Sequence, residues 1–326
     1  MRRAIPSMLG AASVLLATTG SALAQDDYPS RLIRVIVAWP PGTGVDVMMR
    51  LMAEPLRAEL GQTLVIDNRG GASGVIGSEV AALAPPDGYT LLFNSAALTM
   101  VAAMGVQTTY KVPDSFTPVV NVANAPMLLV SHPSLNLKTP QDLVKLAKSK
   151  PGQLIYANSG HGSPSHFAAE LFRTRSGFEA TGVPYRGSPQ AMLDLIAGRA
   201  MYLFTTTSTS LPQVRGGKVT ALAITSKKRH ALAPEIPTMD ELGYKGFSAM
   251  SYWNGLLGPK GLPQPIANRV AAAVNRVLAR PDVLASLAPA GNEIDGKSDP
   301  QSFAAMMKED YATWVGVVKA ANIKPE

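Results

Sequence analysis

The stretch WPPGTGVD at residues 39–46 decides how the first part of the chain folds. It follows the apolar run LIRVIVA at residues 32–38, which is typical of a buried strand, and precedes a helical pattern ending at Leu60. A glycine-rich turn between a strand and a helix leaves backbone N–H groups free at the helix N-terminus, where an anion binds favourably. The stretch therefore predicts the start of an α/β domain and an anion site at its first helix.

Strands and helices continue to alternate along most of the chain. The expected strands are residues 32–38, 63–67, 89–93, 154–157, 181–184, 201–204 and 219–225. The expected helices are residues 45–60, 74–83, 140–148, 164–175, 189–197 and 208–215, with three more starting near Pro263, Pro281 and Pro300. Such alternation predicts parallel sheets with right-handed crossovers.

The pattern changes near residues 117–131, where two apolar runs flank Asn124-Ala125-Pro126. We interpret this point as a crossing between two domains. The C-terminal helices lack enough strands for a sheet of their own, so we expect them to return to the first domain. The sequence thus predicts two Rossmann-like α/β domains joined by two crossovers, with residues 25–124 and 228–326 in domain 1 and residues 125–227 in domain 2. A cleft between such domains is a common place for a ligand.

The first 24 residues are typical of a cleaved secretory signal peptide. Arg2 and Arg3 precede a short apolar stretch, and Ala22-Leu23-Ala24 is an A-x-A cleavage site. The apolar run is shorter than the roughly 20 residues that a spanning helix needs. We therefore expect export to the periplasm.

Charge and cysteine content limit the partners. Lysine and arginine exceed aspartate and glutamate by 30 − 23 = 7, or by 28 − 23 = 5 without Arg2 and Arg3. This mild excess suits an anionic small molecule, but the basic residues form no stripe, so we expect no nucleic-acid binding. There is no cysteine, so any metal site would need histidine and carboxylate ligands. We predict no metal and no cofactor, and we expect a monomer.

Two further turns resemble the opening stretch. Residues 159–163 (SGHGS) and 185–188 (YRGS) each follow an expected strand, and a hydroxyl residue precedes proline at Ser163-Pro164 and Ser188-Pro189. Both serines fit helix N-caps, and the glycines let a ligand approach backbone N–H groups closely. Thr139-Pro140 fits a cap as well, but Asp142 completes a capping box there, so that turn is interpreted as structural. Three amide-presenting turns facing one another would suit a carboxylate.

Other chemistries fit poorly. The Gly42-Thr43-Gly44 turn lacks the third glycine of a dinucleotide site, and Asp46 would place a negative charge where a pyrophosphate must lie. Asp46 more simply caps the helix. No G-x-S-x-G elbow or H-E-x-x-H pattern occurs, and His166 is interpreted as a surface or cleft residue paired with Glu170. We predict no enzymatic activity; a secreted α/β hydrolase is the less favoured alternative.

Several motifs together resemble the Bug family of periplasmic solute receptors. They are WPPGTGVD at 39–46, DNRGGASG at 67–74, PPDGYT at 85–90, YANSGHGS at 156–163, VPYRG at 183–187 and ALAIT at 221–225. Their order and spacing extend over nearly all of the expected mature chain. The resemblance implies a type II periplasmic-binding-protein fold that closes on a small carboxylate and delivers it to the large and small membrane subunits of a tripartite tricarboxylate transporter.

The resemblance also implies which residues hold the ligand. Those carried over by position, together with the neighbouring candidates, are Trp39, Thr43, Gly44, Asp46, Ser95, Ala96, Ser159, Gly160, Gly162, Ser163, His166, Tyr185, Arg186, Gly187, Ser188, Thr205 and Trp253. Ordered water can bridge such contacts.

Two departures concern the far end of the ligand. AMYLFTT at 200–206 replaces an acidic stretch that is frequent in the family, which disfavours an amino-acid ligand. Arg186 replaces a frequent lysine and would suit a second carboxylate, with a solvated loop arginine as the alternative. Trp39 and Trp253 would stack on a flat ligand or serve packing. We therefore expect an aromatic carboxylate or a dicarboxylate. A receptor reporting to a sensor protein would have the same cleft.

Overall fold

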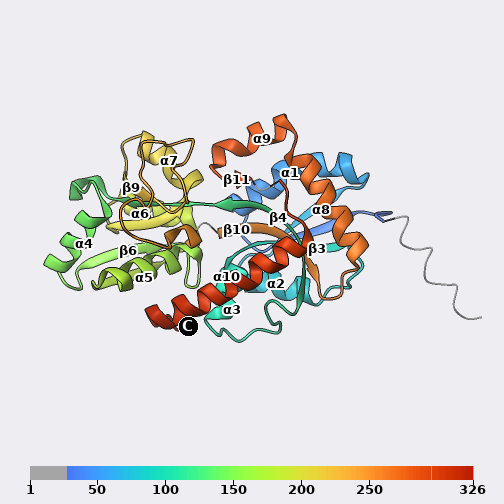
Figure 1. Ribbon diagram of the computed structural model, residues 1–326, viewed down its shortest axis with the longest axis horizontal. Coiled ribbons are helices and arrows are strands. Elements are labelled where there is room, and N and C mark those ends of the chain that lie inside the picture. Colours follow the sequence, from blue (N-terminus) through green and yellow to red (C-terminus); the bar gives the residue numbers. More distant parts are fainter. Residues whose placement is uncertain (1–27, 251, 295, 326) are drawn as a thin grey trace, which may run out of the picture.

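The computed structural model describes residues 28–250, 252–294 and 296–325. The predicted signal peptide, residues 1–24, lies outside these ranges. Two β-sheets, each covered by helices, lie end to end in the molecule (Figure 1). We call the parts built on them the first and the second lobe. No helix within the described residues is both long and apolar enough to span a membrane.

The first lobe is built on a six-stranded sheet with the order β11-β4-β10-β3-β1-β2. Strands β1, β2 and β3 are parallel, whereas β10 runs antiparallel to both β3 and β4. The strands are β1 (Ile33–Val37), β2 (Leu64–Asn68), β3 (Thr90–Ser95), β4 (Phe116–Ala125), β10 (Tyr252–Pro259) and β11 (Glu293–Ile294). The helices are α1 (Gly44–Leu60), η1 (Ala72–Gly74), α2 (Val75–Ala82), α3 (Ala97–Ala103), α8 (Gln264–Leu278), α9 (Pro281–Leu287), η4 (Ala288–Ala290) and α10 (Pro300–Ala321).

The second lobe is built on a five-stranded sheet with the order β7-β6-β8-β5-β9. Its strands are β5 (Met127–Ser131), β6 (Leu154–Asn158), β7 (Ala180–Pro184), β8 (Tyr202–Thr206) and β9 (Thr220–Ile224). Its helices are η2 (Pro133–Leu135), α4 (Pro140–Ser149), α5 (Pro164–Ser176), α6 (Ser188–Ile196), α7 (Thr207–Arg215) and η3 (Phe247–Met250). The capping box predicted at Thr139 is present, with Thr139 Oγ1 accepting from the Asp142 N–H.

The sheets are mixed and not wholly parallel as expected, because each also contains antiparallel strands that were not among those expected from the sequence. β5 runs antiparallel to β8 and β9, and β10 and β11 run antiparallel to β4. The reason is topological: β5 and β10 follow directly on crossings between the lobes, so no helical crossover turns the chain back before them. The short helix α3 and the two-residue β11 were also not anticipated, because neither has a recognisable periodicity.

The chain crosses between the lobes at Pro126 and again before β10. Beyond residue 227, the boundary expected from the sequence, it still packs against the second lobe. The backbone N–H of Met239 donates to Ile224 O on β9, and the Phe247 ring lies 6.0 Å from that of Phe204 on β8. The return to the first lobe therefore follows η3.

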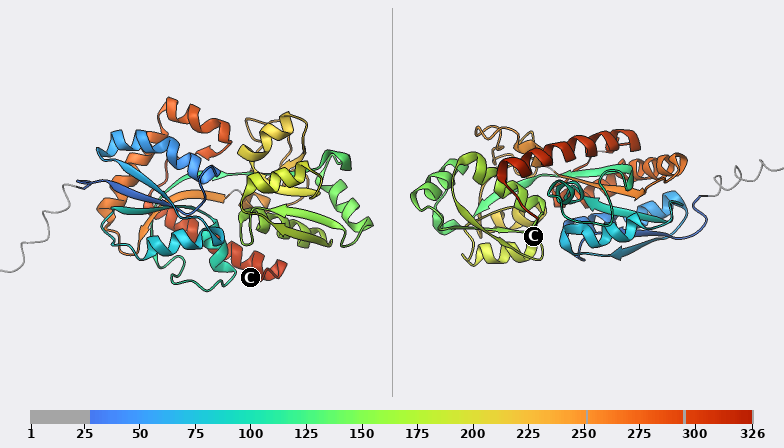
Figure 2. Two further views of the ribbon diagram at one scale, coloured as in Figure 1. Left: turned by 180° about the vertical axis from the view of Figure 1, so that it is seen from behind. Right: turned by 90° about the horizontal axis from the view of Figure 1, so that it is seen from below.

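Helix α10 lies along both lobes (Figures 1 and 2). In the first lobe, the Asp310 carboxylate accepts from Thr99 Oγ1 and Trp253 Nε1; burial raises its pKa to about 6, although these donors oppose the shift. In the second lobe, Trp314 packs edge-on against Phe167 of α5, with 5.5 Å between ring centroids. The C-terminal helix thus does more than cover the first domain, which is all that the sequence indicated.

Candidate functional site

A cavity of about 600 Å³ lies between the two lobes. Residues of both sheets and of the turns that follow their strands line it. From the first lobe these are Trp39, Gly42, Thr43, Gly44, Val45, Val47, Met48, Ser95, Ala125, Tyr252, Asn254 and Asn292. From the second lobe they are Met127, Ser159, Pro164, Ser165, Gly187, Ser188, Pro189, Met192, Leu193, Ile196, Thr205, Thr206, Ser208, Thr209, Pro212, Gln213 and Lys218.

Four helices begin at this cavity: α1 from the first lobe, and α5, α6 and α7 from the second. Each follows a strand directly, so its N-terminus lies at the carboxyl end of a strand. A helix N-terminus carries about half a positive charge and unpaired N–H groups. The starts of α1 and α7 approach closely, since a Cβ atom placed on Gly44 would lie 3.7 Å from Ser208 Oγ. The cavity is therefore surrounded by positive dipole ends.

Side-chain charge agrees with this polarity. Among the described lining residues there is no aspartate or glutamate, and Lys218 alone carries a full charge. An anion would meet donors and a cation without any opposing carboxylate. A ligand ammonium group would find no acid to pair with, as the absence of the acidic stretch at 200–206 led us to expect.

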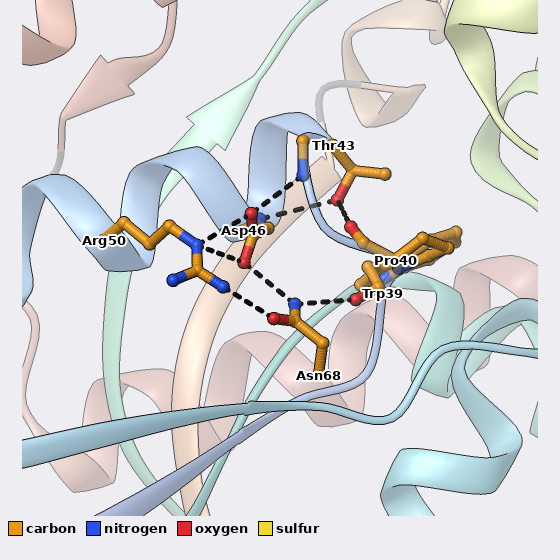
Figure 3. Close-up of polar contacts among 7 residues, drawn as sticks. Trp39, Pro40, Thr43, Asp46, Arg50 and Asn68 are labelled. Atoms are coloured by element: carbon orange, nitrogen blue, oxygen red, sulfur yellow. Dashed lines mark hydrogen bonds and ion pairs between the residues drawn. The ribbon is translucent and has the colours of Figure 1, made fainter.

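The stretch at residues 39–46 forms one wall of the cavity, but the carboxylate of Asp46 is hydrogen-bonded to neighbouring groups of the protein (Figure 3). Asp46 accepts from the Gly42 N–H at 2.8 Å, from Arg50 Nε at 2.9 Å and from Asn68 Nδ2 at 2.8 Å. Burial alone would raise the pKa of Asp46, but these donors lower it below the ordinary value. Asp46 therefore holds the turn in shape and does not line the cavity. Thr43 and Gly44 do line it, and Thr43 Oγ1 caps α1.

The helix after the turn at residues 185–188 begins differently from the prediction. The helix begins one residue earlier than expected, with Gly187 as the N-cap at φ 117° and Ser188 already helical. The prediction that Ser188 caps the helix is therefore wrong: Gly187 takes the N-cap position, because its positive φ costs glycine little. No side chain caps the helix. Gly187 and Ser188 both line the cavity.

Two buried polar atoms at the cavity have no hydrogen-bond partner within the described part of the chain. They are Thr205 Oγ1 on β8 and Asn254 Oδ1 on β10, and their residues are 1% and 2% exposed. An unpaired buried polar group is costly unless water or a ligand satisfies it. The two residues come from different sheets, and both line the cavity. Ser95, the residue opposite Asn254 in the sheet, also lines the cavity.

The other glycine turn of the second lobe, at residues 159–163, faces a different neighbour. Ser159 lines the cavity, but Gly160, Gly162 and Ser163 do not. Ser73 Oγ of the first lobe donates to His161 O at 2.6 Å. A Cβ placed on Gly162 would lie 3.2 Å from Met104 Sδ. This turn contacts the first lobe directly instead of being open to the cavity.

His166 differs from its predicted surroundings. It is 7% exposed, and Glu170 pairs with Arg173 and Tyr156 instead. His166 Nδ1 accepts from the Gly162 N–H at 3.3 Å, and the ring lies 4.5 Å from that of His161. Burial, and then the neighbouring His161, lower the pKa of His166 to about 4. The residue is therefore neutral near pH 7 and supports the turn. Its i, i+4 spacing to Glu170 made a surface pair plausible, but α5 buries that face.

Four more predicted residues lie outside the cavity lining. Trp253 is 2% exposed, packs edge-on against Phe303 and donates to Asp310, so it serves packing. Ala96 is buried, and Tyr185 donates from its hydroxyl to Asp194. Arg186 is exposed, so the alternative of a solvated loop arginine matches its position. Trp39 does line the cavity, and its Nε1 donates to Asn94.

The sequence did not indicate that the start of α7 lines the cavity, nor that Asn254, Asn292 and Lys218 do so. The hydroxyl run from Thr205 to Ser210 follows a strand and opens a helix, a signal that could have indicated a third amide-presenting turn in this lobe. Asn254, Asn292 and Lys218 come from segments with no motif, so nothing in the sequence pointed to them. Within the described ranges, no group of three or more histidine, aspartate or glutamate residues could hold a metal ion.

Residues 48–323 match the TctC family, described as the tripartite tricarboxylate transporter family receptor. The chain belongs to this family. Three similar proteins of known structure support the assignment and the fold. The periplasmic binding protein BugD is 30% identical, with a TM-score of 0.83, and the match covers 92% of this chain and all 100% of BugD.

Two of the three were solved with a carboxylate. MatC from Rhodopseudomonas palustris, with bound malate, is 30% identical with a TM-score of 0.82, and the match covers 89% of this chain and 100% of MatC. Rpa4515 from R. palustris, with adipate, is 32% identical with a TM-score of 0.84, and the match covers 92% of this chain and 100% of Rpa4515. The expected two-domain periplasmic-binding-protein fold and the Bug resemblance are thus confirmed.

Proposed function

We propose that this receptor captures a small organic carboxylate in the periplasm and delivers it to the membrane subunits of a tripartite tricarboxylate transporter. The observation that carries the proposal is the convergence of four helix N-termini on a cavity whose described lining has no acidic side chain. Thr205 and Asn254 add polar residues to the lining, one from each sheet. The bound malate and adipate of two relatives point to the same ligand class.

Binding is tested by thermal shift and calorimetry against aromatic carboxylates, dicarboxylates, amines and sugars. A ligand at about 100 times its Kd should add roughly 2.7 kcal/mol to the free energy of unfolding. We expect carboxylates alone to do so. Stabilisation by amines or sugars, with none by any carboxylate, would refute the proposal.

A matched pair of variants locates the site. Gly44→Leu places a large side chain between the starts of α1 and α7, where even a Cβ lies 3.7 Å from Ser208 Oγ. The affinity of the Gly44→Leu variant for the carboxylate should fall at least 100-fold. The control is Gly316→Leu, which is also a glycine within a helix and has nothing within 4 Å of an added Cβ. The control should bind normally; equal loss in both variants would indicate a general folding defect.

Delivery is tested with the large and small permease subunits in membrane vesicles. Uptake of the identified carboxylate should require both the subunits and the receptor. Capture of a sensor protein by the liganded receptor, without any stimulation of uptake, would support the signalling alternative instead. N-terminal sequencing of the periplasmic protein should give a start at Gln25.

A further inference from the structure

The charge of the protein is unevenly divided between the two lobes. Residues 126–250, which build the second lobe, contain 14 basic and 7 acidic residues, a net charge of 14 − 7 = +7. Residues 25–125 and 251–326 contain 14 basic and 16 acidic residues, a net charge of 14 − 16 = −2. The excess of positive charge therefore lies entirely in the second lobe. Such a concentration of one sign of charge attracts a partner of the opposite sign.

Arginine, and not lysine, forms the ion pairs within the described part of the second lobe. These pairs are Arg173–Glu170, Arg173–Glu179, Arg199–Asp194 and Arg229–Glu241. Most of the acidic side chains of the lobe are therefore already engaged by a guanidinium group. The lysines of the lobe carry charge that no carboxylate of the described chain neutralises in an ion pair.

Four exposed lysines gather on helix α4 and its flanks, and we call them the α4 lysine cluster. Lys145 and Lys148 lie one turn apart on the helix, so they project from the same face. Lys138 precedes the helix, and Lys150 follows it directly. On the opposite face, the buried Leu143 packs into the hydrophobic core and fixes the helix to the lobe. The cluster is thus presented to solvent on a well-anchored helix.

The stability of α4 does not explain the whole cluster. The Asp142 carboxylate accepts from the N–H groups of Lys138 at 3.0 Å and Thr139 at 2.9 Å, and these bonds hold the pKa of Asp142 below its ordinary value. This carboxylate is therefore bound to the start of the helix and forms no ion pair with a lysine. A cation at the N-terminal side, such as Lys138, opposes the helix dipole. The position of Lys138 therefore points to an external partner.

We propose that the α4 lysine cluster binds the anionic headgroup surface of a phospholipid membrane. Four lysines within one short segment match the basic clusters that bind acidic lipids. The ten residues of α4 extend over about 15 Å, so the charges are spread over a surface, which suits a layer of headgroups better than one small anion. Helix α4 lies at the end of the second lobe that is distant from the first lobe (Figures 1 and 2), and none of its residues lines the cavity. The receptor can therefore rest on a membrane without blocking its ligand site.

The test measures cosedimentation of the protein with vesicles of phosphatidylcholine alone and with vesicles of equal parts phosphatidylcholine and phosphatidylglycerol. We expect binding to the anionic vesicles only. The binding should be lost between about 0.1 M and about 1 M salt, because the Debye length falls from about 10 Å to about 3 Å. Equal binding to both kinds of vesicle, or none to the anionic vesicles at low salt, would overturn the proposal.

A matched pair of double variants separates the cluster from the net charge of the lobe. Lys145→Gln with Lys148→Gln should weaken binding to anionic vesicles about 10- to 30-fold, since each lysine near such a surface contributes about fivefold. The control, Lys227→Gln with Lys228→Gln, removes two charges from other exposed lysines of the same lobe and should weaken binding less than about threefold. Equal weakening by both would overturn the assignment to α4.

Carboxylate affinity, measured by calorimetry on the same variants, keeps this inference separate from the proposed function. Both double variants should bind the carboxylate as the natural protein does, because neither pair of lysines lines the cavity. A natural protein that binds anionic vesicles and no carboxylate would refute the proposed function alone. If Lys145→Gln with Lys148→Gln lowered uptake in permease vesicles while the natural protein bound no anionic lipid, the partner would be an acidic face of the membrane subunits, and the lipid proposal would be wrong.

Discussion

The turns at residues 159–163 and 185–188 follow neighbouring parallel strands and contain similar residues, yet they have different surroundings. The first contacts the other lobe through Ser73 and Met104, and His166 supports it from within. The second leaves Gly187 and Ser188 at the cavity. A glycine turn at a helix start can therefore join two lobes or remain open to a ligand, and its neighbour across the cleft decides which. We therefore expect substitutions at the first turn to lower stability and substitutions at the second turn to lower ligand affinity.

The largest expected effect concerns His166, at the turn that joins the lobes. Because its folded pKa is lowered from 6.5 to about 4, neutral His166 stabilises the fold above pH 6.5, and this contribution is lost as pH falls towards 4. The loss amounts to at most about 3 kcal/mol. His166→Asn offers an acceptor near the Nδ1 position and does not titrate there. Chemical denaturation at pH 7 and pH 4.5 should show a smaller decrease in the variant; equal decreases would contradict the buried neutral state.

The next effect concerns Gly187, at the turn that is open to the cavity. Gly187→Ala puts a Cβ on a residue at φ 117°, a conformation that L residues rarely adopt, and shifts the start of α6. Carboxylate affinity should fall about 100-fold, which corresponds to about 2.7 kcal/mol. The free energy of unfolding should fall by about 1 to 3 kcal/mol. Undiminished affinity, measured by calorimetry, would exclude this turn from the ligand site.

A smaller effect is expected for Ser73. Ser73→Ala removes the hydrogen bond from Ser73 Oγ to His161 O between the lobes. The free energy of unfolding should decrease by about 1 kcal/mol, the usual net contribution of one hydrogen bond. A variant as stable as the natural protein in urea denaturation would show that the first turn is not a stabilising contact.

The smallest effect is expected for Ser188. Ser188→Ala removes a hydroxyl that does not cap α6, so stability should change by less than about 0.5 kcal/mol. Carboxylate affinity should fall about threefold to tenfold, as expected when one direct or water-mediated hydrogen bond is lost. If Ser188→Ala lowered stability as much as Ser73→Ala, the contrast between the two turns would be refuted.

Much of the architecture followed from local patterns. The strand at 32–38 and the helix ending at Leu60 were recognisable because apolar periodicity and punctuation by glycine and proline report local conformation directly. The direction of β10 was not recognisable, since an apolar strand has the same sequence pattern in parallel and in antiparallel pairing. The residues of the candidate site likewise include some that the sequence revealed and some that it did not. Thr43 and Gly44 were found from their turn, whereas Lys218 reaches the cavity only through the packing of α6 beside α7.

The sequence by itself determined the α/β elements, the Asp46 helix start, the lack of an acidic stretch at 200–206 and the resemblance to a receptor family. These depend on residues close together in the chain, where spacing alone sets which groups meet. Only the tertiary structure decided which glycine turn stays open, that His166 is buried and that Trp253 packs against Phe303. Those outcomes depend on contacts between segments far apart in the sequence, and local periodicity carries no information about such neighbours.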